Sequence, residues 1–329
     1  MVFIFILLAL FSIFYYKASL RPVSADKTLQ PREVVIPKGA GLKNIAAILK
    51  KEGMIRDKFT FEVYCKLSKK AGKIIAGKYY LGQYMGTGEI VDILASGKAQ
   101  IDTVKFTIPE GYELRQIVDK LVELGLVNRE AFINSLNNGK YNYDFIKDIP
   151  GRENKLEGYL FPDTYEVYKD ASPEDIINKM LERFSVIYNP DYQKRAKELN
   201  MTMDQVITLA SIIEREAKLD SERSIISAVF QNRIKKHMLL QSCATVQYIL
   251  KERKEVLSYK DVEIDSPYNT YKNLGLPPGP IASPGVKSIE AALYPADVDY
   301  LYFVANGDGS HVFSRTYEEH IEAQNKMKK

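Results

Sequence analysis

The same pattern of residues occurs twice in the first half of the sequence. Residues 35–39 read Val-Ile-Pro-Lys-Gly, and residues 107–111, which lie 72 positions further on, read Thr-Ile-Pro-Glu-Gly. Each copy continues into apolar residues at helical spacing and then into a glycine that suits a helix C-cap, Gly53 in the first copy and Gly125 in the second. Each copy therefore predicts a strand, a turn and an amphipathic helix, so this half of the chain should alternate β and α elements.

A further strand and a short helix are expected between the two copies. Residues 77–81 (Gly-Lys-Tyr-Tyr-Leu) are typical of a strand, and residues 89–94 are typical of a helix that ends at Gly97. This order resembles LysM domains, small β-α-α-β modules that bind glycans containing N-acetylglucosamine. We therefore expect a LysM-like domain at residues 33–101 and a second LysM-like half-repeat at residues 104–127. A module that serves only as a spacer fits the same pattern.

The N-terminus is apolar. Residues 2–16 form a helix too short for a hydrocarbon core of about 30 Å, but flanking apolar residues and a snorkelling Lys17 make a marginal span. A cleavable signal peptide is the alternative, because Val-Ser-Ala at residues 23–25 resembles a processing site, although no Lys or Arg precedes the apolar run. We expect a single-pass transmembrane anchor in the cytoplasmic (inner) membrane over residues 1–20 and a linker over residues 21–32. The remaining chain would lie on the outer or periplasmic side.

The composition excludes several classes of protein. Apolar residues make up 46% of the chain and charged residues 27%, as in ordinary globular proteins. The net charge of +4 is mild and no long basic run is present, so we expect no nucleic-acid partner. Cys65 and Cys243 lie far apart, and the three histidines lack ligand spacing, so we expect no disulfide, no metal and no cofactor.

Residues 102–329 are expected to form one mixed domain, which makes the fold class α+β. The predicted helices are residues 175–184, 190–199, 203–218 and one that begins at Ser221. Thr202 and Gln205 form a capping-box pair at the start of the third helix. Residues 266–285 are dense in Pro and Gly and predict an ordered or lid-like loop, and Asn-Gly-Asp-Gly at residues 306–309 predicts a hairpin.

Two glutamates lie near the end of the predicted helix 203–218. Glu216 ends an apolar face that includes Ile213 and residues one and two turns earlier. Partial burial disfavours the charged form of a carboxyl group, as a general acid requires. Glu214 lies on a weaker apolar face. The alternative is that both glutamates are solvated helix charges, with Glu214 paired to Lys218.

Two aromatic segments fit no simple helix or strand period. One is residues 155–165, and the other is Ser-Pro-Tyr-Asn-Thr-Tyr at residues 266–271. Nearby prolines limit the freedom of the second segment, so Asn269 and its flanking tyrosines would be presented at little entropic cost. Tyrosine offers an apolar face to a sugar ring and a hydroxyl to the polar rim of that ring. A structural proline-rich connector is the alternative.

Five segments together resemble the signature blocks of the MltG (YceG-like) family. They are LEGYLFPDTY, ASIIEREA, VFQNRIKKHMLLQS, SPYNTYKNLGLPPGPIASPG and LYFVANGDGSHVFSRTYEEH, in the order of the family. The resemblance runs from about residue 33 to the end of the chain. The apolar N-terminus and the LysM-like segment match the family layout, although the cytoplasmic residues expected before the anchor are absent.

The resemblance implies an enzyme, an endolytic lytic transglycosylase of the lyase class. Such an enzyme cleaves the β-1,4 bond between N-acetylmuramic acid and N-acetylglucosamine in nascent peptidoglycan and leaves 1,6-anhydro-muramic ends, which terminates strand elongation. The second carboxylate of the ExE pair, Glu216, is then the catalytic acid/base. The expected substrate-binding residues are Glu157, Asp163, Glu214, Gln241, Ser242, Tyr268, Asn269 and Tyr271.

Peptidoglycan glycan strands are thus the expected substrate, and cell-wall synthases (penicillin-binding proteins) are expected partners at the level of the family. Two alternatives remain open. One is a hydrolytic muramidase, in which water replaces the C6 hydroxyl of the sugar as nucleophile. The other is a non-catalytic glycan-binding scaffold of the cell-wall synthesis machinery.

Overall fold

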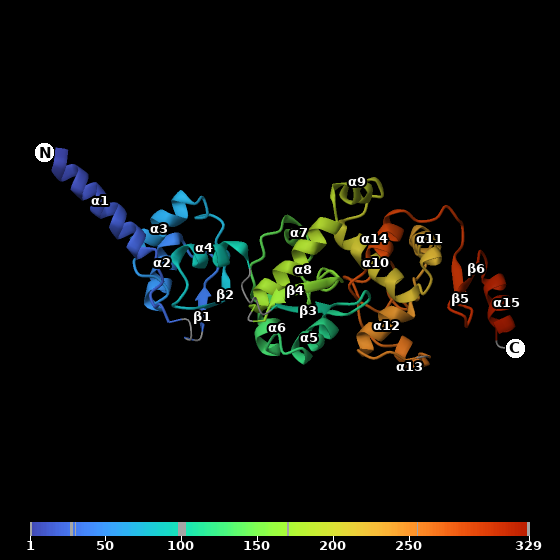
Figure 1. Ribbon diagram of the computed structural model, residues 1–329. Coiled ribbons are helices and arrows are strands. Elements are labelled where there is room, and N and C mark those ends of the chain that lie inside the picture. Colours follow the sequence, from blue (N-terminus) through green and yellow to red (C-terminus); the bar gives the residue numbers. More distant parts are fainter. Residues whose placement is uncertain are drawn as a thin grey trace. The chain divides into compact units, whose positions relative to one another are not determined.

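The computed structural model describes residues 2–26, 29, 31–97, 103–169, 171–254 and 256–327. The chain divides into two compact units, residues 1–103 and residues 104–329 (Figure 1). Both units contain helices and strands, so the α+β fold class is confirmed.

The elements of the first unit are α1 (Val2–Ser19), β1 (Arg32–Ile36), α2 (Leu42–Lys51), α3 (Lys58–Leu67), β2 (Gly77–Leu81) and α4 (Thr87–Ser96). The core of this unit is formed by a pair of strands and three helices, α2, α3 and α4. Strands β1 and β2 are antiparallel, with Val34 opposite Tyr79. Val34 and Tyr79 are buried in the core of the unit, while their neighbours along each strand are more exposed. The sheet therefore has one covered face and one open face, and the element order from β1 to β2 is β-α-α-β.

The predicted transmembrane helix is not supported. Within the described part of the chain, no helix is both long enough and apolar enough to span a membrane. Helix α1 has 18 residues and ends at Ser19, which gives about 27 Å at 1.5 Å per residue, less than a hydrocarbon core of about 30 Å. The predictions of a membrane anchor over residues 1–20 and of a single-pass membrane location are therefore wrong.

The segment that follows α1 is hydrogen-bonded to the rest of the first unit. The guanidinium of Arg56 donates hydrogen bonds to the carbonyl oxygen of Pro22 at 2.6 and 2.8 Å. The backbone amides of Thr87 and Ser24 donate to the carbonyl oxygens of Leu20 and Gln83. Residues 20–24, which include the start of the predicted linker (residues 21–32), are therefore hydrogen-bonded to this unit.

The second unit is mostly helical. Its strands are β3 (Thr103–Thr107), β4 (Thr164–Tyr168), β5 (Tyr302–Ala305) and β6 (His311–Ser314), and β3 pairs with β4. Its helices are α5 (Leu114–Glu123), α6 (Arg129–Asn138), α7 (Asp144–Lys147), α8 (Pro173–Ile187), α9 (Pro190–Glu198), α10 (Met203–Glu216), the 3-10 turn η1 (Asp220–Glu222), α11 (Arg223–Lys235), α12 (Cys243–Leu250), α13 (Tyr259–Val262), α14 (Val286–Leu293) and α15 (Tyr317–Met327). The predicted hairpin is confirmed, because β5 and β6 are antiparallel around residues 306–310.

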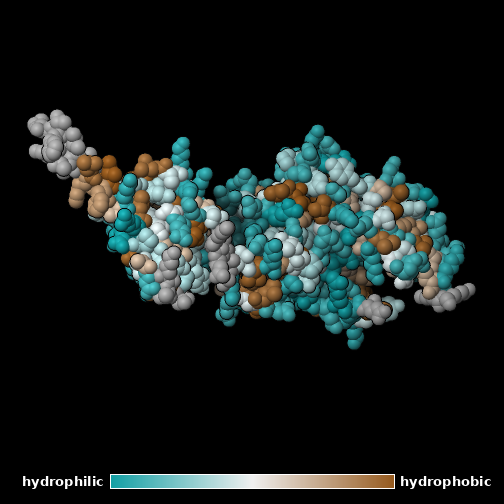
Figure 2. Space-filling model, viewed as in Figure 1, coloured by the Kyte–Doolittle hydropathy of each residue, from teal (hydrophilic) through white to brown (hydrophobic). Residues whose placement is uncertain are grey.

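Hydrophobic residues of the second unit lie mainly in one core. On the face that Figure 2 shows, those at the surface of this unit form separate small patches among hydrophilic residues. The core contains side chains from α5, α6, α8, α10, α11 and α14. At the C-terminal end of the chain, β5, β6 and α15 pack on one another (Figure 1).

Helix α10 is the central element of this unit. Every residue from Val206 to Ile213 is buried, and the helix packs against α9, α11, α12 and α14. Its start is the predicted capping box, in which Thr202 accepts from the backbone amide of Gln205 and the side chain of Gln205 accepts from the amide of Thr202. Leu209, Ile212 and Ile213, which share a helix face with Glu216, are buried as expected, but the other faces between Val206 and Ile213 are buried too, so burial does not distinguish the face of Glu216.

Candidate active site

Glu216 is the last residue of α10 and is only partly buried. Its Oε1 atom accepts a hydrogen bond from the hydroxyl of Ser242 and a longer one, 3.4 Å, from the backbone amide of Ala244. Ser242 is the N-cap of α12, and Ala244 lies in the first turn of that helix. Because unpaired amides give a helix N-terminus a partial positive charge, they stabilise the carboxylate. Among the described residues, no group hydrogen-bonds to the second oxygen, Oε2, which therefore remains available to a ligand.

Glu214 has a different environment, although it lies only two residues earlier. Its side chain is 7% exposed, and its Oε2 atom accepts from the amide of Gly285 at 3.0 Å and pairs with Arg223 at 3.3 Å. Gly285 is the N-cap of α14. The predicted alternative partner, Lys218, makes no ion pair with Glu214. Burial, together with the charge of Glu214, raises the pKa of Glu110, which packs beside Gly285. Glu214 thus holds the start of a second helix in place.

Arg215, between the two glutamates, is also fixed. Its guanidinium donates to the carbonyl oxygen of Gly111 at 3.1 Å and lies 3.5 Å from the carboxylate of Glu113. Its side chain is almost fully buried. The three residues of the Glu-Arg-Glu segment therefore each bind a different part of the second unit, and Glu216 is the one whose carboxylate makes no ion pair with a described residue.

Gln241, Ser242 and Tyr271 lie around Glu216. Gln241 adopts a left-handed backbone conformation, with φ of 50°, and its amide donates to the carbonyl oxygen of Thr270 at 3.0 Å. The amide of Ser242 donates to the hydroxyl of Thr270 at 3.0 Å. The Tyr271 hydroxyl lies 3.1 Å from the Cys243 thiol, and burial raises the pKa of this tyrosine. Of the predicted residues, Ser242 therefore contacts the carboxylate directly, whereas Gln241 is its neighbour in the chain and Tyr271 lies beside Cys243.

Asn269 is fully buried and organises the loop rather than facing solvent. Its amide nitrogen donates to the carbonyl oxygens of Val262 and Ile264, both at 2.8 Å, and its oxygen accepts from the amide of Tyr271 at 3.0 Å. Val262 is the last residue of α13, and the other two partners lie in the loop that follows this helix. Asn269 thereby fixes the backbone that carries Tyr271, whereas a direct contact of Asn269 with substrate remains a prediction.

Glu157 and Tyr268 lie at a cavity separate from the contacts of Glu216. Glu157 is 2% exposed, and its oxygens accept from the amide of Leu114 at 2.8 Å and from the Tyr248 hydroxyl at 3.2 Å. Burial raises the pKa of Glu157 to about 8. The rings of Tyr248 and Tyr268 are 5.2 Å apart. The cavity has a volume of about 360 Å³.

Asp163, the remaining predicted residue, lies beside β4. Its carboxylate accepts from the Arg183 guanidinium at 2.6 Å and from the backbone amide of Thr164 at 2.7 Å. None of its described contacts is shared with Glu216, so the structure does not bring this residue to the same place.

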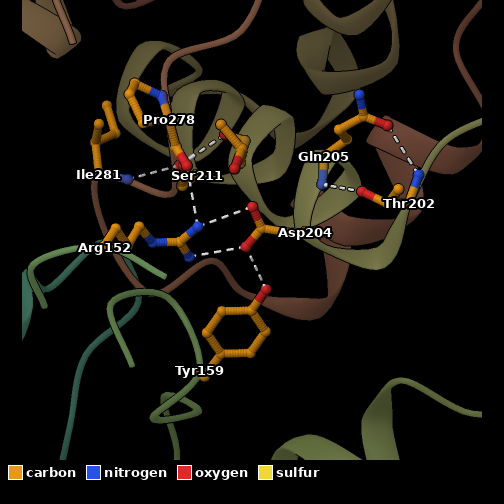
Figure 3. A network of polar contacts seen from close by, with 9 residues as sticks. Arg152, Tyr159, Thr202, Asp204, Gln205, Ser211, Pro278 and Ile281 are labelled. Atoms are coloured by element: carbon orange, nitrogen blue, oxygen red, sulfur yellow. Dashed lines mark hydrogen bonds and ion pairs between the residues drawn. The ribbon is translucent and has the colours of Figure 1, made fainter. Parts of the chain in front are cut away.

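A buried ion pair that the sequence did not point to supports the start of α10. Asp204 receives two hydrogen bonds of 2.8 Å from Arg152 and one of 2.7 Å from the Tyr159 hydroxyl (Figure 3). Arg152 also donates to the carbonyl oxygen of Pro278 at 3.0 Å. Further along α10, the Ser211 hydroxyl accepts from the backbone amide of Ile281 at 3.0 Å. This network ties the proline-rich loop to α10.

In the described residues, no group of three His, Cys, Asp or Glu side chains is arranged to hold a metal ion. The groups that the structure brings together at Glu216 are its own carboxyl group, the hydroxyl of Ser242 and the backbone amide of Ala244. This carboxyl group can donate a proton from Oε2 and regain one, while Oε1 keeps its orientation.

Comparison with known proteins identifies relatives over nearly the whole chain. A family model described as the YceG-like family matches residues 34–326. The endolytic murein transglycosylase of Bacillus subtilis (strain 168) is 38% identical over 323 residues, which cover 95% of this chain and 89% of that protein. The endolytic murein transglycosylase of Streptococcus pneumoniae serotype 2 is 31% identical over 332 residues, which cover 93% of this chain and 60% of that protein.

A solved structure is also similar. The 2.6 Å crystal structure of a yceG-like protein from Listeria monocytogenes matches with a TM-score of 0.60 and 37% sequence identity. The match covers 88% of this chain and 98% of that one. The similarity therefore extends to the fold of the described residues as well as to the sequence.

Proposed function

The chain belongs to the YceG-like family, and on that premise we propose that it is a lytic transglycosylase, a lyase that cleaves peptidoglycan strands. Two relatives that align with more than nine-tenths of this chain carry the name endolytic murein transglycosylase. The observation that supports the proposal most is the setting of Glu216, in which one carboxylate oxygen is held at a helix N-terminus and the other has no described partner.

One carboxyl group is sufficient for this reaction. Glycoside hydrolases generally use two, about 5 to 9.5 Å apart, one as acid and the other as base or nucleophile. The nearest glutamate in sequence, Glu214, is already bound to Arg223 and Gly285. In a lytic transglycosylase the nucleophile is the C6 hydroxyl of the substrate, so no second free carboxylate is needed. Because Glu214 is bound to Arg223 and Gly285, it is poorly suited to act as a second catalytic carboxylate, which favours this reaction over that of a two-carboxylate muramidase.

We assign both proton transfers to Glu216. Its protonated Oε2 gives a proton to the glycosidic oxygen as the bond from that oxygen to C1 of N-acetylmuramic acid breaks. The C6 oxygen then bonds to C1, and its proton returns to Glu216. The product ends in a 1,6-anhydro ring, and the carboxyl group is protonated again. The fixed distance between C6 and C1 favours this intramolecular attack.

Ser242 and the start of α12 have a positioning role in this mechanism. Glu216 is an anion between the two proton transfers, and its Oε1 then accepts from the Ser242 hydroxyl and lies near the Ala244 amide. Both donors favour the anion. Tyr271, which is close by, is placed to contact the sugar, as its ring offers an apolar face.

The finer parts of the proposal rest on the family resemblance. We propose nascent strands as substrate, termination of elongation as outcome, synthases of the cell wall as partners, and binding of glycans containing N-acetylglucosamine by the first unit. Pull-down with purified synthases tests the partnership, and failure to retain any of them contradicts it.

The test is digestion of purified peptidoglycan by the wild-type chain and by Glu216→Gln, with products identified by mass spectrometry. The glutamine keeps an oxygen acceptor for Ser242 but has no acidic proton, so the fold should persist and cleavage should stop. Glu182→Gln, at an exposed position of α8, is the matched control and should cleave normally. Equal cleavage by wild type and Glu216→Gln contradicts the assignment, and absence of cleavage by the wild type contradicts the function.

A further inference from the structure

The cavity beside Glu157 is built for a small ligand. Apolar side chains of α5 and α6 form one side of it, and Tyr248 with Ile249 from α12 form another. Tyr268 lies at its edge, 5.2 Å from Tyr248 between ring centres. Its volume of about 360 Å³ lies within the range of small-molecule sites, about 300 to 1,000 Å³. The lining combines the aromatic rings of Tyr248 and Tyr268 with aliphatic side chains, which suits the apolar face of a sugar ring and an apolar substituent on that ring.

The charged residues at the cavity largely compensate one another. Arg115 pairs with Glu113 at 2.6 Å, and Arg129 pairs with Asp119 at 2.6 Å. A strongly anionic ligand would have to compete with these carboxylates for both arginines. The ion pairs therefore favour an uncharged ligand over an acidic peptide.

The remaining titratable groups leave the cavity close to neutral. Lys251 and Glu153 line it and carry opposite charges. Burial raises the pKa of Glu157 to about 8, so this carboxyl group is mostly protonated at neutral pH.

Two segments lead from Glu216 to this cavity. Helix α12 contacts Glu216 through Ala244 and contacts the cavity through Tyr248, one turn and about 6 Å further along the helix axis. The loop of residues 266–285 also connects the two places. Its Thr270 accepts a hydrogen bond from Ser242 beside Glu216, and its Tyr268 lines the cavity. A glycan strand whose scissile bond lies at Glu216 would therefore reach the cavity within one or two sugar rings.

We propose that this cavity binds one N-acetylhexosamine ring of the glycan strand, with the sugar face on Tyr268 and the acetyl methyl group against the apolar residues of α5 and α6. The inference rests on the proposed function, because it names a position for the same substrate. Tyr268 then determines how tightly and in which register the strand binds, without taking part in the proton transfers of Glu216.

The chain contains no tryptophan, so a single introduced tryptophan can report binding at the cavity alone. Asn137, on α6, lines the cavity, whereas Asn134, also exposed and on the same helix, is not among the lining residues. Asn137→Trp and the control Asn134→Trp are each made in the full chain carrying Glu216→Gln, which prevents cleavage. The probe is a tetramer of β-1,4-linked N-acetylglucosamine, and tryptophan emission is followed during titration.

The expected result is a saturable change for Asn137→Trp and no change for Asn134→Trp. When Tyr268→Ala is added to Asn137→Trp, the affinity for the tetramer should fall by about tenfold, as expected for loss of an aromatic contact. Tyr259→Ala, which removes a tyrosine that is 90% exposed outside the cavity, should leave the affinity unchanged. Circular dichroism of each variant verifies that the fold is retained. In the cleaving enzyme, Tyr268→Ala should raise KM and change kcat little.

Other outcomes overturn the proposal. If the tryptophan emission responds to the isolated stem peptide of peptidoglycan and not to the tetramer, the cavity binds peptide and not sugar. Equal responses of Asn134→Trp and Asn137→Trp, or no response of either, would rule out sugar binding at the cavity. If the wild-type chain still cleaves peptidoglycan through Glu216 in those cases, the proposed function stands and the cavity assignment alone fails. Cleavage that does not depend on Glu216 contradicts the assignment of the acid/base, and absence of cleavage by the wild type contradicts the proposed function, whatever the tryptophan titration shows.

Discussion

The buried carboxyl group of Glu157 makes the stability of the second unit depend on pH in a predictable way. Burial raises the pKa of this group from its ordinary value of 4.5 to about 8 in the folded chain. The folded state therefore binds one proton more than the unfolded state between these two values. Stability falls as the pH rises wherever the folded state binds more protons. The contribution of the protonated Glu157 to the free energy of unfolding is thus fully present below about pH 4.5. It decreases as the pH rises and is lost above about pH 8.

Glu157→Gln removes this dependence. The amide oxygen can still accept from the Leu114 amide, and the amide nitrogen can donate to the Tyr248 hydroxyl. Each pH unit of the interval corresponds to ~1.4 kcal/mol, so the free energy of unfolding of the variant should exceed that of the wild type by roughly 4 to 5 kcal/mol at pH 9. Near pH 5 the two proteins should differ by less than about 1 kcal/mol.

The assay is denaturant unfolding followed by circular dichroism at several pH values. The transition of the second unit is identified by its larger helical signal. Other titrating groups are common to both proteins, so their contributions cancel in the difference. Parallel pH profiles for wild type and Glu157→Gln, or a wild type that gains stability relative to the variant as pH rises, would refute the reasoning.

Three further outcomes follow from particular contacts. Asp204→Asn should lower the free energy of unfolding by about 3 to 5 kcal/mol in denaturant titrations, because it leaves the guanidinium of Arg152 buried without its counter-charge; a change below about 1 kcal/mol contradicts this. Gly158→Ala should destabilise the chain more than Gly275→Ala, since both glycines have positive φ but only at Gly158 would a Cβ atom lie 2.6 Å from a proline of the loop; melting temperatures in the opposite order contradict it. Maleimide should modify the accessible Cys243 and block cleavage sterically, with a rate that rises above pH 9 because burial of the thiol raises its pKa; full activity after modification contradicts this.

Local signals in the sequence were sufficient for much of the fold. The capping box of Thr202 and Gln205 and the turn at residues 306–309 depend on residues close together in the chain, and both form as predicted. The boundary of α1 was not predictable in this way. The apolar run was extended through Leu20, whereas the helix ends at Ser19.

The surroundings of the two glutamates could not be derived from helical periodicity. Glu214 and Glu216 differ because one is bound by Gly285 and Arg223 and the other by Ser242. Gly285 and Ser242 are far from these glutamates in the chain. The helix is covered on all sides between Val206 and Ile213, so no polar face distinguishes the glutamates. Ser242 was predicted from the family blocks alone.

The residues that the sequence did not point to are mainly structural. Arg152 and Asp204 are 52 positions apart and form no recognised motif, yet they join the proline-rich loop to α10 (Figure 3). Asn269 was expected in the cleft from the family block that contains it. Its amide hydrogen-bonds to the backbone of Val262, Ile264 and Tyr271, since a tight turn rich in polar backbone groups needs an internal partner, and a contact with substrate remains a prediction.

The central claim, a one-carboxylate reaction at Glu216 with the C6 hydroxyl as nucleophile, is tested most directly by digestion in ¹⁸O-labelled water. Because the new bond to C1 comes from an oxygen of the sugar itself, wild-type products should carry anhydro ends without ¹⁸O, and Glu216→Gln should give no products. Incorporation of ¹⁸O into newly formed reducing ends would show attack by water and would contradict the account.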